Sequence, residues 1–137
     1  MNQNLLDQLK KHEGFRGEVY KCTAGANTIG YGRNLDANPL TPEEAEHLLK
    51  NDVSTVVEKL RDKRLLAGHN EARQAVIINM AFNLGFAGLI KFKNMLTHYM
   101  EHDYYLAAEE MLDSRWANQV GNRAVELAEQ MATGEWQ

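Results

Sequence analysis

This chain has only one cysteine and no long apolar run, which argues against internal disulfides and membrane spans. Cys22 is the only cysteine in 137 residues, so no disulfide can form within the chain. The longest apolar window, residues 75–90, is interrupted by Asn79 and Asn83. No segment reaches the roughly 18–20 uninterrupted apolar residues that a transmembrane helix needs. We therefore expect no membrane insertion.

Two further absences concern the start of the chain and its charge. Residues 1–7, MNQNLLD, contain neither the basic region nor the apolar core of a signal peptide. Net charge is −4, and residues 101–137 hold 2 Lys/Arg against 8 Asp/Glu. A nucleic-acid-binding protein would show a basic stripe instead. We therefore expect no nucleic-acid partner.

Length and composition predict one α+β domain. A hydrophobic content of 44% with 25% charged residues is typical of a globular protein of single-domain size. Glycines and strand-forming residues predict a small β lobe at about 13–40, followed by a long connecting helix at about 41–63. Residues of about 64–137, together with 1–12, are predicted to form a larger helical lobe.

Capping signals define several helix boundaries. Thr41 is predicted to cap the connecting helix, with Pro42 in the first helical position and Glu44 completing a capping box. Asn70 is predicted to cap a helix that Gly85 ends. Further helices are predicted near residues 87–100, 103–112 and 122–132.

Glu13, Cys22 and Thr28 form the strongest candidate for a catalytic group. They are nine and then six residues apart and surround a glycine-rich stretch. A carboxyl group can donate a proton, a cysteine can attack or hold water, and a hydroxyl can orient water. The structural alternatives are a solvated glutamate, a buried cysteine and an ordinary strand threonine.

A second chemical possibility lies at residues 98–102. His98, Glu101 and His102 fit the His-x-x-Glu-His pattern of some zinc peptidases. Such a site needs both histidines on one stable helix, yet Asp103 is expected to cap the following helix. The pattern therefore leaves a zinc peptidase as an alternative function.

Several segments resemble the phage-type lysozymes, also called endolysins or muramidases. KHEGFR at residues 11–16 leads into CTAGANTIGYG at 22–32 and matches the family signature of Glu, eight residues, Asp or Cys, five residues and Thr. Residues 40–53, 75–85 and 114–124 are similar to the family's connecting helix, buried central helix and C-terminal signature. The resemblance covers nearly the whole chain and implies a lysozyme-like fold.

The resemblance implies hydrolysis of the β-1,4 bond between N-acetylmuramic acid and N-acetylglucosamine in peptidoglycan. Glu13 would be the general acid, and Cys22 with Thr28 would hold the attacking water. Cys22 as a covalent nucleophile is the alternative mechanism. Arg123 matches the arginine that pairs with the catalytic glutamate. Sugar-contacting positions are matched by Leu35, Phe82, Asn83 and Arg115.

The resemblance also implies a cellular role. We expect a monomer that needs no metal or cofactor and that lyses bacterial cell walls. It would stay in the host cytoplasm until a holin pore releases it to the periplasm and cell wall. A zinc-dependent wall peptidase and a non-catalytic wall-binding module are the two alternatives.

Overall fold

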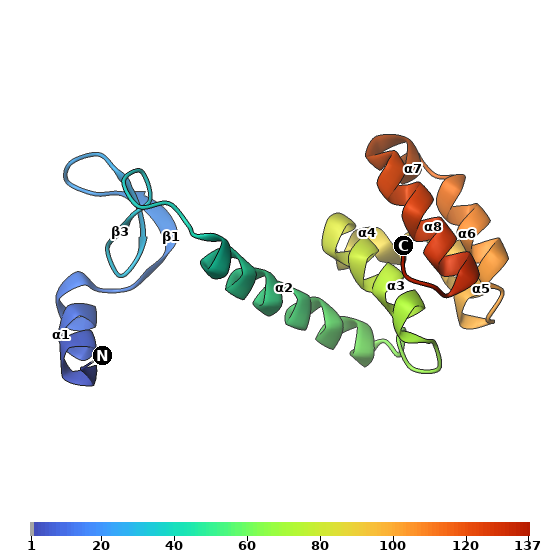
Figure 1. The fold of residues 1–137 in the computed structure, drawn as a ribbon, viewed down its shortest axis with the longest axis horizontal. Coiled ribbons are helices and arrows are strands. Elements are labelled where there is room, and N and C mark those ends of the chain that lie inside the picture. The colour runs from blue at the N-terminus through green and yellow to red at the C-terminus, as the bar shows by residue number, and fades with distance from the viewer. Residues whose placement is uncertain (1) are drawn as a thin grey trace. The chain divides into compact units, whose positions relative to one another are not determined.

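The structure is a computed structural model that describes residues 2–137. It divides into an N-terminal unit that ends at Leu48 and a C-terminal unit, Leu49–Gln137. Helices and a small antiparallel sheet make up the described residues (Figure 1), so the predicted α+β class is confirmed. Among residues 2–137, no helix combines the length and the apolar character that crossing a membrane requires.

The N-terminal unit contains one short helix, the sheet and the start of a long helix. Its elements are α1 (Gln3–Glu13), β1 (Arg16–Lys21), β2 (Asn27–Gly30), β3 (Arg33–Asn34) and the first part of α2 (Pro42–Asp62). The strands pair in the order β1-β2-β3, and both pairs are antiparallel. The strand-forming residues of the predicted small β lobe thus form a three-stranded sheet.

Thr28 lies at the centre of this sheet. It faces Tyr20 on β1 and Asn34 on β3, because β2 is the middle strand. Its side chain is buried, with 3% exposed. A residue held from both sides in this way has little freedom, which suits a hydroxyl that must orient a small molecule.

The start of α2 has the predicted capping box. The Glu44 N–H donates to Thr41 Oγ1 over 3.2 Å, and the Thr41 N–H donates to Glu44 Oε1 over 2.9 Å. Arg33 of β3 also forms an ion pair with Glu44. The Thr41 N–H and then Arg33 lower the pKa of Glu44 to about 2. The sheet is thus tied to the first turn of α2, a link that the sequence did not predict.

The C-terminal unit is helical. It contains the rest of α2 and six more helices: α3 (Glu71–Leu84), α4 (Phe86–Ile90), α5 (Lys93–Met100), α6 (Tyr104–Leu112), α7 (Arg115–Val120) and α8 (Asn122–Thr133). Its core is formed by side chains from all these helices. The largest fully buried ones are Leu60, Val76, Ile77, Met80, Leu89, Met95, Tyr99, Met111 and Met131.

Two boundaries differ from the prediction. The helix predicted near 87–100 is two helices, α4 and α5, separated at Phe92. Phe92 leaves helical geometry, and its ring packs edge-on against Trp116 at a centroid distance of 6.1 Å. The short helix α7 was not predicted, although Ser114 caps it by accepting from the Ala117 N–H.

Other predicted boundaries are confirmed. Asn70 caps α3 by accepting a hydrogen bond from the Arg73 N–H, and α3 ends at Gly85. The sequence assigns residues 1–12 to the helical lobe, whereas α1 belongs to the N-terminal unit of this structure. Packing of α1 against the helices of the C-terminal unit stays a prediction.

A buried histidine organises one end of the C-terminal unit. His69 stacks on Tyr99 with ring centroids 3.8 Å apart, and on its other side His102 stacks at 4.7 Å. Its Nδ1 is 2.7 Å from the Tyr104 hydroxyl, and Arg73 lies over the Tyr104 ring. Burial, and then the neighbouring His102 and Arg73, lower the pKa of His69. The neutral imidazole therefore fits this site best.

This arrangement predicts a stability that falls in acid. The unfolded chain binds the His69 proton more readily, so the stabilisation is complete above about pH 6.5 and decreases as the pH falls. Thermal unfolding between about pH 7.5 and about pH 5.5 should show a smaller pH dependence in His69→Phe than in the natural chain. The exposed His47 serves as control, and His47→Phe should keep the full dependence. An unchanged dependence in His69→Phe would contradict this account.

Candidate functional site

Glu13 is positioned by the end of α1 and by a glycine in the β2–β3 turn. It is the last residue of α1, and its side chain is exposed. A Cβ atom at Gly32 would lie 2.6 Å from Glu13 Oε2, so a side chain there would force the Glu13 carboxylate to move. Gly32 also has a φ of +77°, which favours glycine. The carboxylate therefore lies directly against the backbone of the sheet.

Cys22 lies in the tight turn between β1 and β2. Its N–H donates to Ala26 O over 3.0 Å, and its carbonyl accepts from the Gly25 N–H over 2.8 Å. The backbone N–H groups of Ala26 and Ala24, and then the Thr28 hydroxyl, lower the pKa of the Cys22 thiol. Amide groups that face a sulfur stabilise its thiolate form. This turn therefore favours a reactive cysteine.

The Thr28 hydroxyl has a defined direction. It donates its hydrogen to Ala26 O over 3.0 Å, so its oxygen is free to accept a hydrogen bond from water. When the Cys22 thiol ionises, the same hydrogen can turn towards the sulfur. Cys22 and Thr28 thus form a pair that can hold a water molecule or stabilise a thiolate.

Leu35 is fixed beside this strand by a residue that the sequence analysis missed. The Leu35 N–H donates to Asn27 O over 2.7 Å. Asp36 accepts from both the backbone and the side chain of Asn27, over 2.9 and 3.1 Å. The two bonds from Asn27 lower the pKa of Asp36. The sequence shows the aspartate, but it does not show that its partner is Asn27, nine residues away.

Arg123 and Phe82 lie together in the C-terminal unit. Both line a hollow of about 340 Å³, which Val53 and Ile78 also line. The Arg123 guanidinium donates two hydrogen bonds to Asn79 Oδ1, over 2.7 and 3.1 Å. Asn79 is a second residue that the sequence analysis missed as a site residue. The sequence does contain a signal for Asn79, because its polar side chain interrupts the apolar window of residues 75–90.

Asn83 contacts Trp116, and Arg115 precedes Trp116 in the chain. Asn83 Oδ1 accepts a hydrogen bond from Trp116 Nε1 over 2.7 Å, which fixes the amide. Arg115 is the first residue of α7 and is exposed. The amide nitrogen of Asn83 and the Arg115 guanidinium are both hydrogen-bond donors, and the oxygen of a sugar hydroxyl can accept from either of them.

The predicted residues are thus divided between the two units. Cys22 and Thr28 contact each other, and Glu13 borders the same sheet at Gly32. Among the described residues, Glu13 makes no hydrogen bond to either of them. The predicted pairing of Glu13 with Arg123 stays a prediction.

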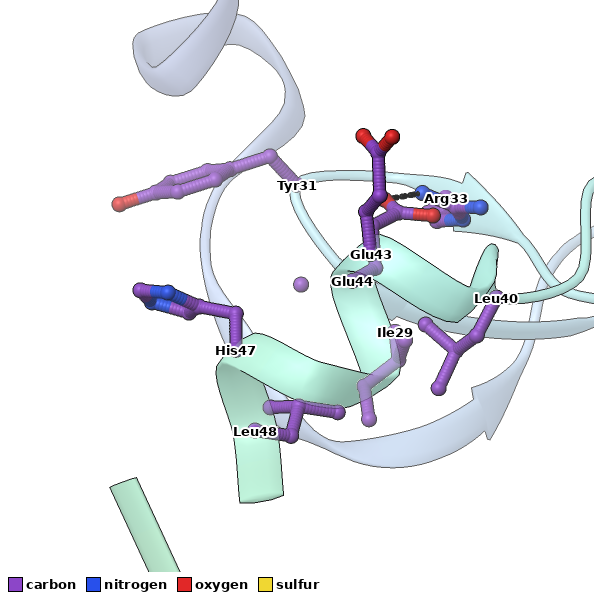
Figure 2. Close-up of a pocket in the computed structure, with 9 residues that line it drawn as sticks. Ile29, Tyr31, Arg33, Leu40, Glu43, Glu44, His47 and Leu48 are labelled. Atoms are coloured by element: carbon purple, nitrogen blue, oxygen red, sulfur yellow. Dashed lines mark hydrogen bonds and ion pairs between the residues drawn. The ribbon is translucent and has the colours of Figure 1, made fainter. Parts of the chain in front are cut away.

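One hollow of the N-terminal unit is not lined by any of the predicted catalytic residues. It measures about 490 Å³ and lies between β2, β3 and the start of α2. Figure 2 shows Leu40 at one side of it and Tyr31 and His47 at the other. Its walls are mainly apolar, and Arg33 and Glu44 neutralise each other there. It lacks a paired acid and nucleophile, so we place the candidate site at Glu13, Cys22 and Thr28.

The zinc-peptidase pattern is not assembled as such a site requires. α5 ends at Met100, so His98 and His102 do not share a helix. His102 faces His69 and donates from Nε2 to Gly68 O over 3.1 Å. Within residues 2–137, the one group that could hold a metal ion is His98, Glu101 and Asp103, whose ligand atoms lie within 4.8 Å of one another.

Comparisons with known proteins agree on one family. A sequence model described as phage lysozyme matches residues 10–131. A probable T4-type lysozyme 1 of Dictyostelium discoideum is 29% identical, over 98% of this chain and 96% of that protein. An endolysin of Acyrthosiphon pisum secondary endosymbiont phage 1 is 28% identical, over 85% of this chain and 80% of that protein.

One relative is much longer than this chain. The pre-baseplate central spike protein Gp5 of Enterobacteria phage T4 is 28% identical over 97% of this chain. The chain spans 28% of the length of that spike protein. The match therefore concerns one part of a larger protein.

The surroundings of Cys22 predict a thiol that ionises early. Because Cys22 is the only cysteine, the rate of iodoacetamide alkylation against pH reports on this residue alone. The midpoint should lie below about 8.5, the usual thiol pKa. Thr28→Val should raise it, whereas Thr23→Val, at an exposed neighbour, should not. A midpoint at or above the usual value in the natural chain would refute this assignment.

Proposed function

The chain belongs to the phage lysozyme family, and we propose on this basis that it hydrolyses the β-1,4 bond between N-acetylmuramic acid and N-acetylglucosamine in peptidoglycan. The observation that carries the proposal is the position of Glu13. Its carboxylate lies against Gly32, on the same small sheet that carries Cys22 and Thr28. An acid and a water-holding pair on one rigid element can act on one glycosidic bond.

The proposed reaction proceeds by direct attack of water. Glu13 donates its proton to the glycosidic oxygen as the bond to the anomeric carbon breaks, and the N-acetylglucosamine leaves as an alcohol. A water molecule, oriented by the Thr28 oxygen, attacks the anomeric carbon from the opposite face. The Cys22 thiolate accepts the proton that this water loses. The product has an inverted anomeric configuration.

The alternative mechanism uses Cys22 as the nucleophile. Its sulfur would attack the anomeric carbon, form a glycosyl–sulfur bond and be released by water in a second step. The lowered pKa of Cys22 is compatible with both mechanisms. They differ in one intermediate, since only the second leaves a glycosyl group on the protein during turnover.

The remaining residues are proposed to support the substrate. Arg123 would pair with Glu13 in the active state, while Leu35, Phe82, Asn83 and Arg115 would contact the glycan. The protein would act as a monomer on the bacterial wall, after release from the cytoplasm through a holin. The names of the endolysin and the lysozyme relatives support peptidoglycan as the substrate.

Replacement of the acid tests the proposed function directly. Glu13→Gln keeps the size of the side chain but removes its proton, so lysis of purified peptidoglycan should fall about 10²- to 10⁴-fold. Glu18→Gln, at an exposed glutamate of β1, serves as control and should keep full activity. Unchanged lysis in Glu13→Gln would show that Glu13 is not the catalytic acid.

The same assay distinguishes the proposed glycoside hydrolysis from the zinc-peptidase alternative. Addition of EDTA should leave the activity of the natural chain unchanged, because no step of the proposed reaction uses a metal ion. Loss of activity in EDTA, together with new amino groups in the digest, would favour the zinc peptidase.

Gly32 offers a second test, of the position of the acid. Alanine at a positive φ costs about 1–2 kcal/mol of stability, so both Gly32→Ala and Gly68→Ala should be destabilised. Gly68 has a φ of +89°, and a Cβ atom added there would have no other atom within 4 Å, which makes it the matched control. Only Gly32→Ala displaces Glu13 and should lower kcat, by about ten- to a hundredfold. Equal kcat values in the two variants would show that Gly32 does not position the acid.

A further inference from the structure

An apolar groove lies between α6 and α8 of the C-terminal unit, two helices that pack side by side (Figure 1). It has a volume of about 260 Å³. Four residues of each helix line it: Tyr105, Ala108, Glu109 and Leu112 of α6, and Val125, Ala128, Glu129 and Ala132 of α8. None of the predicted catalytic or sugar-contacting residues is among them.

The lining residues follow the same helical spacing on both sides. Each helix contributes positions i, i+3, i+4 and i+7, which form one stripe along its surface. Ala108 and Ala128 are buried and form a floor of small side chains. The walls are exposed, with 70% of Tyr105, 53% of Val125 and 49% of Leu112 accessible to solvent. Contiguous apolar side chains at this exposure mark an interaction surface rather than scattered surface residues.

The two charged side chains that line this groove are both carboxylates, while the Arg73 guanidinium of α3 lies at the C-terminal end of α8, where it donates to the Met131 and Ala132 carbonyls. Glu109 and Glu129 occupy equivalent i+4 positions on its two sides. α6 contains no lysine or arginine, and α8 contains only Arg123, whose guanidinium bonds Asn79. No cation of these two helices is therefore left to neutralise the two carboxylates.

We propose that the α6–α8 groove binds an amphipathic helix of a partner protein, with an apolar stripe flanked by lysine or arginine. Two packed helices with a floor of small residues accept a third helix by packing its ridge between them. The stripe from i to i+7 is about 10 Å long, which corresponds to about two turns of the bound helix. Cations beside its apolar stripe would meet Glu109 and Glu129.

Charge also argues against two other occupants. A second copy that used the same groove about a two-fold axis would bring these carboxylates against each other. An anionic membrane surface would be repelled for the same reason. A basic helix satisfies both the apolar stripe and the charge.

Three labelled probe peptides test the proposal with the full chain. The first, of about 14 residues, has leucines in a helical stripe and lysines elsewhere. The second replaces every lysine with glutamate, and the third keeps the composition of the first but scatters its leucines. Fluorescence anisotropy should show saturable binding of the first peptide, and at least about tenfold weaker binding of the other two. Amide NMR shifts caused by the first peptide should concentrate on α6 and α8.

Charge reversal at the groove provides the decisive comparison. Glu109→Lys with Glu129→Lys should weaken binding of the lysine peptide by at least about tenfold and create binding of the glutamate peptide. Glu110→Lys with Glu126→Lys makes the same change in charge, on the same two helices, outside the groove lining. This control pair should change both affinities much less.

Three results would overturn the proposal. The first is an equal effect of the two double variants, since the peptide would then sense only net charge. The second is NMR shifts that lie elsewhere on the chain. The third is a concentration-dependent dimer that Val125→Glu abolishes, because a second copy would then be the occupant. Thermal unfolding of each variant shows whether it is folded before binding is compared.

Discussion

The contact between Glu13 and Gly32 is the constraint on which the candidate site depends. α1 ends at Glu13, and the β2–β3 turn passes so close to its carboxylate that a Cβ atom at Gly32 would displace it. This places the acid against the backbone of the strand pair that contains Thr28. The Arg33–Glu44 ion pair then ties the same strands to the first turn of α2. The acid, the sheet and the start of α2 are thereby connected through two local contacts, without help from a large hydrophobic core.

Local signals in the sequence predicted much of the fold, because helix ends are determined within a few residues. The Thr41–Glu44 capping box and the Asn70 cap are both present. The break at Phe92 was missed because it depends on Trp116, which lies far along the chain. The site shows the same limit. Spacing indicated Glu13, Cys22 and Thr28, whereas Asn79 and Asp36 became visible only through partners that folding brings to them.

Cys22 connects the local structure with the proposed chemistry. Amide groups of its own turn, and not a neighbouring cation, lower the pKa of the thiol. This differs from an aspartate at the same position, which would be charged at neutral pH without assistance. The backbone amides of the turn thus favour the ionised form of Cys22, which a thiol of ordinary pKa does not reach at neutral pH.

The relatives support the family and the kind of reaction. Their alignments with this chain run over more positions than the chain has residues. Those relatives therefore contain segments with no counterpart here.

The chemical nature of the cleaved bond tests the central claim most directly. Purified peptidoglycan can be digested with the natural chain, and new reducing ends and new amino groups can be counted in the same soluble products. The account predicts that every cut creates one reducing end on N-acetylmuramic acid and no new amino group. New amino groups without new reducing ends, or reducing ends on N-acetylglucosamine, would contradict it.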